Sequence, residues 1–228
     1  MSNNFIIVSI EGNIGSGKST LLSNLRNYYE DDANVVFLKE PVDEWNKIND
    51  ENGITILEKF YSDQSKYSFP FQMLAYVSRL KVLRDVLKGI TNFEKKTIII
   101  TERSLYTDKM VFAKMLYDTD KIEHINYQIY LNLFNTFSEE FPVHKIVYVK
   151  TIHEICHSRI QKRSRKGETN IPIEYLFDCG NYHDDMLEKL ADNGICNDHL
   201  VLDGNIDIYK NTTQITEWID TIDKFIKI

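Results

Sequence analysis

A glycine-rich segment near the start of the chain has the residue types and spacing of a phosphate-binding loop. Gly12, Gly17, Lys18 and Ser19 fit the pattern G-x-x-x-x-G-K-[ST], directly after an apolar run. Such glycines let backbone N–H groups surround phosphates, while the lysine neutralises the transferring group and the serine hydroxyl binds Mg²⁺. A helix that begins at Lys18 adds the positive end of its dipole. We expect Mg²⁺ and a triphosphate such as ATP on residues 12–20, held by Gly12, Asn13, Ile14, Gly15, Ser16, Gly17, Lys18, Ser19 and Thr20.

Two carboxylates follow later apolar runs. Glu40 precedes Pro41, which favours an extended backbone, so we expect Glu40 to be the last residue of a strand. It is a candidate base for the attacking hydroxyl, although an ordinary surface glutamate fits the same pattern. Glu102 ends the third run, where such proteins place a ligand of Mg²⁺ or its waters, and Arg103 can reach the phosphoryl group. A second role, a glutamate favoured at a helix N-terminus by the helix dipole, is compatible with the first at Glu102.

The segment between residues 40 and 80 indicates what receives the phosphate. It is rich in aromatic residues and contains one arginine, Arg79. A nucleoside monophosphate site needs several arginines, whereas a neutral aromatic molecule needs stacking partners and a few hydrogen bonds. The second description fits better. Gln72, Ala75 and Arg79 share one helical face, from which the two polar side chains can read the edge of a base. Several aromatics are expected to be core residues, namely Tyr67, Phe69 and Tyr76.

A basic segment, RIQKRSRK at residues 159–166, has five basic residues in eight. Because it continues from the helix after the fourth apolar run, it is typical of a lid, here about residues 159–170, whose arginines reach the phosphates. A solvated helix face is the simpler alternative, and a nucleic-acid patch is disfavoured by the acidic chain.

Five short apolar runs without polar alternation are expected to be strands buried on both faces of a parallel sheet. They are Phe5–Ile10, Val35–Leu38, Thr97–Thr101, Lys145–Val149 and His199–Leu202. Segments with helical periodicity lie at residues 18–30, 54–62, 68–88, 103–116, 121–137, 152–162, 172–191 and 211–226. This alternation predicts an α/β fold, a three-layer sandwich of the P-loop NTPase type with a five-stranded parallel sheet and helices on both faces. Ligands bind at the carboxyl ends of such strands, where the motifs above lie.

Length and composition indicate a single soluble domain over residues 1–228. Hydrophobic residues make up 43% and charged residues 27%, and the net charge of −7 is unsuited to sequence-independent nucleic-acid binding. Three widely spaced cysteines indicate reduced thiols: Cys156, Cys179 and Cys196. No apolar run has the length of a membrane span and no targeting pattern is evident, so we expect a cytoplasmic protein without nucleic-acid or membrane partners.

Taken together, the motifs resemble the deoxyribonucleoside kinases of the deoxycytidine, deoxyguanosine and insect multisubstrate group. The resemblance extends to about Lys210 and rests on IEGNIGSGKST, EPVDEW, YSFPFQMLAYVSR, ERSLYTD, RIQKRSRKGETNIPIEYL and LVLDGN, in this order. It implies ATP-dependent phosphorylation of a deoxynucleoside 5′-hydroxyl in nucleotide salvage, for DNA precursor synthesis. It also implies a homodimer, for which residues 103–137 could supply the face.

The resemblance also implies roles for individual residues. Glu40 resembles the base at the 5′-hydroxyl, and Arg103 the arginine at the 5′-oxygen and phosphoryl group. The 3′-hydroxyl is expected to lie against Tyr61 and Glu168. The base is expected between Phe71 and Phe112, hydrogen-bonded by Gln72, with Ile14 and Trp45 as further walls, and the lid arginines are expected to be Arg159, Arg163 and Arg165.

Arg79 and Asp108 match the arginine–aspartate pair of the deoxycytidine and deoxyguanosine kinases, whereas thymidine-accepting relatives carry apolar or small residues there. A carboxylate accepts from an exocyclic amine, which thymine lacks. We therefore expect deoxycytidine and purine deoxynucleosides to be favoured over thymidine. A thymidine-preferring or broad multisubstrate kinase stays the alternative.

Two positions depart from the family pattern. Ser164 replaces a glycine of the lid, which affects the expected flexibility of the lid, and Ile208 stands where an aromatic residue stacks on the donor adenine. The preferred phosphate donor, the best base, any feedback inhibitor, the oligomeric state and the source organism are left open by the sequence.

Three other classes of function have weaker support. HEICH at residues 153–157 matches the zinc-protease pattern H-E-x-x-H, but no third ligand stands at a recognisable spacing. DENG at 50–53 and NKIN at 46–49 imitate GTPase motifs, but no apolar run leads into the first and the second lacks its final aspartate. A nucleoside monophosphate kinase is the nearest rival, and the arginine-poor acceptor segment disfavours it.

Overall fold

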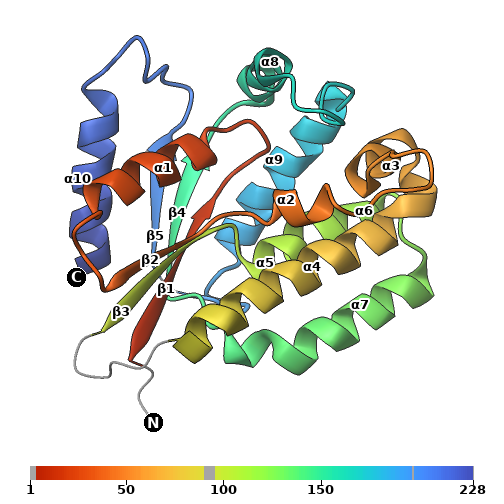
Figure 1. The fold of residues 1–228 in the computed structure, drawn as a ribbon, viewed down its shortest axis with the longest axis horizontal. Coiled ribbons are helices and arrows are strands. Elements are labelled where there is room, and N and C mark those ends of the chain that lie inside the picture. Colours follow the sequence, from red (N-terminus) through yellow and green to blue (C-terminus); the bar gives the residue numbers. More distant parts are fainter. Residues whose placement is uncertain (1–3, 90–95, 197, 228) are drawn as a thin grey trace.

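The computed structural model describes residues 4–89, 96–196 and 198–227. Within them, five parallel strands form one sheet in the order β2-β3-β1-β4-β5 (Figure 1). The strands are β1 (Phe5–Glu11), β2 (Val35–Leu38), β3 (Thr97–Glu102), β4 (Lys145–Lys150) and β5 (His199–Asp203). The predicted fold class and all five predicted strands are confirmed, and several strands end one residue later than expected.

Burial on both faces holds for the central strands and not for the edges. β1 and β4 are almost entirely buried, because each has a strand on both sides and a helical layer on both faces. β5 is an edge strand, and its Val201 is 49% exposed. The expectation of two buried faces is therefore wrong for β5, whose short apolar run resembles that of a central strand.

The helices follow the predicted alternation with two short additions, α2 and η2. Their bounds are α1 (Lys18–Tyr28), α2 (Val42–Trp45), α3 (Ile56–Ser62), α4 (Gln64–Gly89), α5 (Leu105–Thr107), the π-helix η1 (Asp108–Ala113), α6 (Lys114–Asp118), α7 (His124–Phe137), the 3₁₀-helix η2 (Ser138–Glu140), α8 (His153–Arg163), α9 (Ile173–Glu188) and α10 (Gln214–Lys227). None of the helices in the described ranges is long and apolar enough to span a bilayer.

Alternate side chains of β1 divide the core into two apolar layers. Val8 and Ile10 pack with Leu21 of α1 and Ile222 of α10. Ile7 belongs to the other layer, with side chains of α4 and α7. Figure 1 shows the same arrangement: α1 and α10 lie on one side of the sheet, and α4, α7 and α9 on the other. This sandwich leaves the carboxyl edge of the sheet open for a ligand.

Two local expectations are wrong. Glu40 is not the last residue of a strand, because β2 pairs only with β3 and the ladder ends at Leu38 opposite Thr101, so Glu40 lies in the following loop. The helix expected over 103–116 begins only at Leu105, because Arg103 has a left-handed backbone with φ of 63°.

Candidate active site

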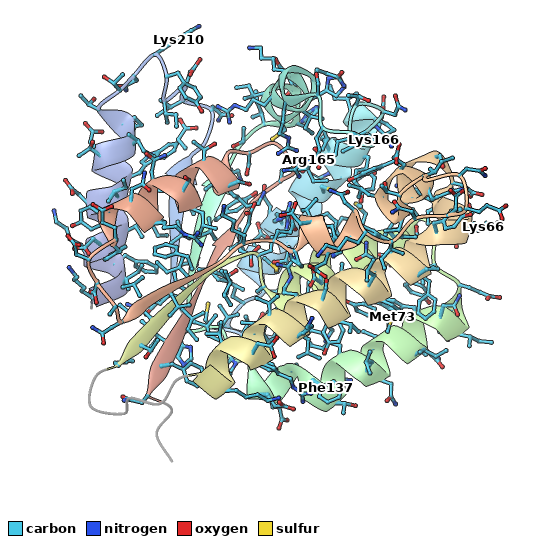
Figure 2. The ribbon with its side chains drawn as sticks, viewed as in Figure 1. Lys66, Met73, Phe137, Arg165, Lys166 and Lys210 are labelled. Carbon is cyan, nitrogen blue, oxygen red and sulfur yellow. The ribbon has the colours of Figure 1, made fainter. Side chains whose placement is uncertain are left out.

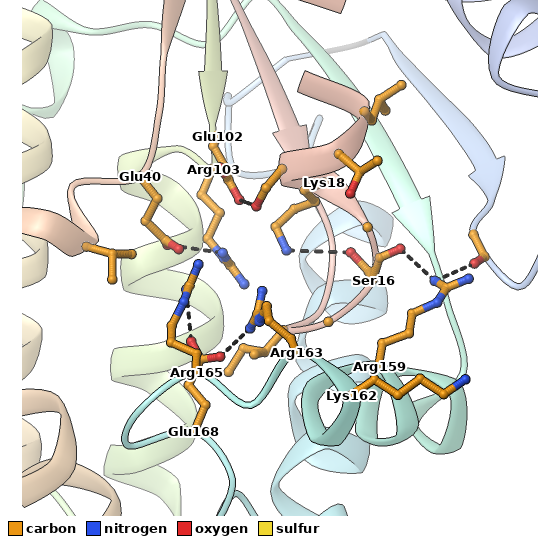
Figure 3. A pocket seen from close by; sticks show the side chains of 18 of the residues that line it. Ser16, Lys18, Glu40, Glu102, Arg103, Arg159, Lys162, Arg163, Arg165 and Glu168 are labelled. Carbon is orange, nitrogen blue, oxygen red and sulfur yellow. Dashed lines mark hydrogen bonds and ion pairs between the residues drawn. The ribbon is translucent and has the colours of Figure 1, made fainter. Parts of the chain in front are cut away.

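One cavity of about 480 Å³ opens at the carboxyl edge of the sheet. Its lining comes from the glycine-rich loop, the segment between β2 and α4, the end of β3, η1, the predicted lid and the loop after β5, together with parts of α1, α4, α9 and α10. Figure 3 shows the charged side chains of these segments converging on the same space. Residues far apart in the sequence thus share one site, as the positions after the strands predicted.

The glycine-rich loop turns through backbone conformations that favour glycine. Gly12, Gly15 and Gly17 all have positive φ, and a Cβ on Gly12 would lie 2.6 Å from the carbonyl oxygen of Val149. A buried hydrogen bond from Asn13 Nδ2 to the carbonyl oxygen of Leu176, 2.7 Å long, fixes the loop against α9. These contacts fix the backbone of the loop.

Lys18 begins α1 and is buried within this loop. Its Nζ donates to the carbonyl oxygen of Asn13 at 2.6 Å. Burial, reinforced by the charge of Arg103, lowers the pKa of Lys18 to about 7. A bound triphosphate would favour the charged ammonium, so the protonation of Lys18 depends on the occupancy of the loop.

Ser19 and Glu102 bring a hydroxyl and a carboxylate together at the expected metal position. Ser19 Oγ donates to Glu102 Oε1 at 2.7 Å, and both side chains line the cavity. Hard oxygen donors of this kind suit Mg²⁺, which binds few protein ligands and takes the rest of its shell from phosphates and water. The donor set therefore fits Mg²⁺ held together with a triphosphate.

Glu40 is held by two arginines. Its Oε1 accepts from Arg103 Nη1 at 3.0 Å and from Arg79 Nη2 at 3.3 Å. Burial alone would raise the pKa of Glu40, but Arg103 and Arg79 outweigh it and lower the pKa to about 2. The carboxylate is therefore ionised, as a proton acceptor or hydroxyl-binding group must be.

Arg103 is held in place by β1 as well as by Glu40. Its backbone N–H donates to the carbonyl oxygen of Ile10 at 3.0 Å, and its Nη2 to that of Gly12 at 3.3 Å. Its guanidinium lies over the ring of Phe112, 5.2 Å from the ring centre. The left-handed backbone of Arg103 turns the chain away from β3 and directs the side chain into the cavity.

The acceptor half of the cavity is walled by aromatic rings. The ring of Trp45 meets that of Phe71 edge-on at 5.2 Å, and Trp45 Nε1 donates to Ser78 Oγ at 2.9 Å. Phe112 and the buried Gln72 also line this space. Three aromatic residues were predicted to be core residues, and none of them is among the described lining residues. Tyr76 is fully buried in the apolar core, and Tyr67 and Phe69 pack against that core.

Arg79 and Asp108 form a buried pair with two contacts. Arg79 Nε lies 2.8 Å from Asp108 Oδ2, and Nη2 lies 3.3 Å from Oδ1. Arg79 Nη1 donates to the carbonyl oxygen of Glu102 at 2.6 Å. Asp108 lines the cavity, whereas Arg79 is not among the described lining residues. Of the two side chains, the carboxylate is therefore the one that a ligand in the cavity would meet.

The lid arginines divide into two groups. Arg163 and Arg165 both pair with Glu168, the latter with Nη1 3.0 Å from Oε1 (Figure 3). Arg159 instead donates from Nη1 to the carbonyl oxygens of Ser16 and Gly204, at 3.0 and 2.9 Å. It thereby joins the glycine-rich loop to the loop after β5.

Ser164 ends α8 with a left-handed backbone, φ of 49°, where glycine is the usual residue. Lys166 Nζ, two residues later, lies 3.3 Å from Glu58 Oε2 of α3. Figure 2 shows Arg165 and Lys166 between α8 and α3. The lid therefore reaches from α8 to the helices of the acceptor half.

Comparison with known proteins identifies the family. The family model described as "Deoxynucleoside kinase" matches residues 8–227. The chain belongs to the deoxynucleoside kinase family. A probable deoxycytidine kinase of fowlpox virus is 32% identical over 222 residues, 96% of this chain and 87% of that protein. Human deoxycytidine kinase is 32% identical over 185 residues, 74% and 70% of the two chains. The mitochondrial deoxyguanosine kinase of Xenopus laevis is 30% identical over 196 residues, 80% and 73%.

This deoxynucleoside kinase family member is a phosphotransferase, as predicted. The family match also continues past Lys210, where the motif resemblance ended, to the end of α10. That helix contributes Ile215 and Trp218 to the cavity, and neither was predicted. No local pattern marks them, because on an amphipathic helix they look like ordinary core residues.

Other lining residues were also missed by the sequence analysis. Phe60 and Tyr175 could have been suspected from their aromatic character, and Lys162 from its place in the basic segment. Tyr209, which is 80% exposed, follows Ile208 in the loop after β5, and both line the cavity. An aromatic side chain is thus present one residue after the position where the family pattern has one.

The zinc-protease and GTPase-like motifs of the sequence lie outside the cavity. In the described part of the chain, no group of three or more His, Cys, Asp or Glu side chains could hold a metal ion. His153 contacts Glu154 and the ring of Phe177. Asp50, in the segment that imitates a GTPase motif, pairs with Lys59 at 2.7 Å. Neither motif contributes to the lining of the cavity.

Proposed function

We propose that this chain transfers the γ-phosphoryl group of ATP to the 5′-hydroxyl of a deoxyribonucleoside, in nucleotide salvage for DNA precursor synthesis. We further propose that residues 1–228 act as one kinase domain. The family membership supports a deoxynucleoside acceptor. The names of the relatives, which include deoxycytidine and deoxyguanosine kinases, support the base preference.

The observation that carries the proposal is the make-up of the acceptor half of the cavity. Its walls include the rings of Trp45, Phe71 and Phe112. A nucleoside monophosphate would need additional arginines there for its own phosphate. Arg79, the arginine predicted in this region, is instead held in a buried pair with Asp108. An uncharged sugar and base fit the aromatic walls, which disfavours the monophosphate kinase alternative.

In the proposed reaction the residues of the site mainly position the two substrates and neutralise the charge of the phosphates. Glu40 accepts the proton of the 5′-hydroxyl or orients it for attack, and Arg103 stabilises the transferring phosphoryl group. Lys18 and the backbone N–H groups of residues 12–20 bind the donor phosphates, with the lid arginines closing over them. Ser19 and Glu102 hold Mg²⁺, which when bound offsets the negative charge of the phosphates.

The sugar and base have proposed contacts of their own. Tyr61 and Glu168 bind the 3′-hydroxyl, and both line the cavity. Burial raises the pKa of Tyr61 well above its ordinary value, so its hydroxyl stays a donor. Asp108 accepts from the exocyclic amine of the base while Arg79 holds it from behind, and each carboxylate oxygen keeps a lone pair for this purpose.

A homodimer is also proposed. Ile125 and Ile129 of α7 are 64% and 49% exposed, and Val77 of α4 is 47% exposed. Exposed apolar side chains on neighbouring helices suit a second copy of the chain. We expect light scattering to give twice the monomer mass for the wild type and the monomer mass for Ile125→Lys.

We also propose that the protein is located in the cytoplasm.

The decisive experiment is a substrate panel. The purified protein is incubated with Mg²⁺ and each of the four deoxynucleosides, first with ATP and then with UTP as donor. We expect deoxycytidine and the purine deoxynucleosides to be phosphorylated faster than thymidine. Thymidine as the best substrate would overturn the base preference. Turnover of deoxynucleoside monophosphates alone would overturn the acceptor assignment.

A further inference from the structure

Glu11, the last residue of β1, is a completely buried carboxylate that the proposed reaction does not use. It accepts from Ser9 Oγ at 2.6 Å and from Thr107 Oγ1 at 2.5 Å. No lysine, arginine or histidine of the described residues lies within ion-pair distance of it. Burial of a carboxylate without an ion pair destabilises the folded state. A contribution to stability therefore does not explain why a glutamate stands at this position.

Because the carboxylate oxygens of Glu11 only accept, they determine which hydroxyl donates in each hydrogen bond that follows. Because Thr107 Oγ1 donates to the carboxylate, it must accept in its contact with Ser104 Oγ, 3.1 Å away. Ser104 Oγ in turn accepts from the backbone N–H of Thr107 at 3.2 Å, as the N-cap of α5. The carboxylate therefore holds the first turn of α5 to the end of β1.

Ser104 directly follows Arg103, whose left-handed backbone is unfavourable for a residue with a bulky side chain. The two backbone carbonyls that hold Arg103 belong to Ile10 and Gly12, the neighbours of Glu11 in the chain. The main chain on both sides of Glu11 thus binds Arg103, and the Glu11 side chain binds the next turn. A strained backbone conformation of this kind persists only when several contacts with the surrounding structure hold it.

We propose that Glu11 is a positioning residue that keeps Arg103 in its left-handed conformation, with the guanidinium directed at Glu40, by anchoring Thr107 and Ser104. This inference rests on the proposed function, in which Arg103 acts on the transferring phosphoryl group. Loss of the anchor lets α5 shift, and Arg103 then loses its alignment although it remains in the site.

Two variants that each remove one hydroxyl from the same carboxylate test the proposal. Thr107→Val deletes the link to α5 with little change in shape, whereas Ser9→Ala deletes the other bond and leaves that link intact. We expect both variants to unfold at a lower temperature than the wild type. Thr107→Val should lower kcat by about 10- to 100-fold with the nucleoside KM nearly unchanged, because misplacement affects the transition state most. Ser9→Ala should keep kcat within about 3-fold.

Further variants and a crystal structure separate positioning from general damage. Thr107→Ser retains the hydroxyl and should retain kcat, whereas Glu11→Leu should lose it as Thr107→Val does. In crystals of Thr107→Val we expect Arg103 to leave its contact with Glu40. Unchanged kcat in Thr107→Val, or an equal loss in Ser9→Ala, would overturn the proposal. If the wild type phosphorylates no deoxynucleoside, the proposed function fails, while the position of Arg103 in those crystals still decides the role of Glu11.

Discussion

Asp108 lines the cavity and binds Arg79, which is not among the described lining residues, through both carboxylate oxygens, at 2.8 and 3.3 Å. In the proposed function a base in the cavity meets the carboxylate of Asp108, and the guanidinium of Arg79 holds that carboxylate in place. Removing both partners should admit the methyl group of thymine and abolish the preference for an exocyclic amine. We expect Arg79→Met/Asp108→Ala to raise the thymidine-to-deoxycytidine ratio of kcat/KM by at least about 100-fold. A ratio that stays at the wild-type value would remove Asp108 from base recognition.

The same pair gives a prediction for stability. Asp108→Ala alone leaves the buried Arg79 without its main counter-ion, which should lower the free energy of unfolding by about 3 kcal/mol or more. The double variant removes both charges and should be the more stable of the two. Chemical denaturation of the two variants measures the difference. A double variant less stable than Asp108→Ala would show that Arg79 contributes mainly through its contacts with Glu40 and the Glu102 carbonyl.

Glu40→Gln removes the proposed proton acceptor and keeps the shape of the side chain. We expect kcat to fall by about 10- to 100-fold, with a smaller change in the nucleoside KM. Glu44→Gln, at a 53% exposed side chain on α2, is the matched control and should have wild-type kinetics. Since Arg103 and Arg79 lower the pKa of Glu40 to about 2, wild-type kcat should show no acid limb from Glu40 above about pH 4. Unchanged turnover in Glu40→Gln would exclude the residue from the mechanism.

Donor binding should be linked to proton uptake by Lys18. Its pKa, lowered from 10.5 to about 7, leaves the amine largely neutral above pH 7 in the free protein. The phosphates favour the ammonium, so ATP should bind with uptake of a proton at pH 8, and with little uptake about one unit below the free pKa. Calorimetry in buffers of different ionisation enthalpy measures this uptake. Lys18→Arg stays charged at both pH values and should show none of it, so equal uptake in that variant would assign the proton to another group.

Tyr61→Phe should reveal recognition of the 3′-hydroxyl. The variant loses only a hydroxyl, so kcat/KM for a deoxynucleoside should fall by about 10-fold. A 2′,3′-dideoxynucleoside has no 3′-hydroxyl to lose, and its kcat/KM should be the same in variant and wild type. An equal fall for both substrates would mean that Tyr61 contributes to the shape of the pocket alone.

Glu102→Gln should weaken the proposed Mg²⁺ site. An amide oxygen is a poorer ligand than a carboxylate, so the Mg²⁺ concentration for half-maximal activity should rise by about 10-fold. Glu140→Gln, at a 47% exposed side chain paired with Arg84, is the control. Titration with Mg²⁺ at saturating ATP and nucleoside measures both. Identical titration curves would place the metal elsewhere.

The strand pattern and the glycine-rich motif were determined by sequence alone. Continuous apolar runs such as that of β3 are typical of strands buried on both faces, which a parallel sheet between two helical layers provides for its central strands. The spacing of Gly12, Gly17 and Lys18 requires a specific turn, since residues with a Cβ cannot follow that backbone without strain. These features depend on neighbours in the chain, and the sequence therefore predicts them.

Only the tertiary structure decided the contacts between distant segments. Arg103 and Glu40 stand 63 residues apart, and their ion pair depends on where β2 ends and on the left-handed backbone of Arg103. In the sequence Glu11 looks like an ordinary residue before a glycine-rich loop, and only the structure shows Thr107 beside it. Trp218 likewise looks like a core residue, and only the structure shows that α10 places it in the lining of the cavity. Such contacts are set by packing between elements, which no local pattern records.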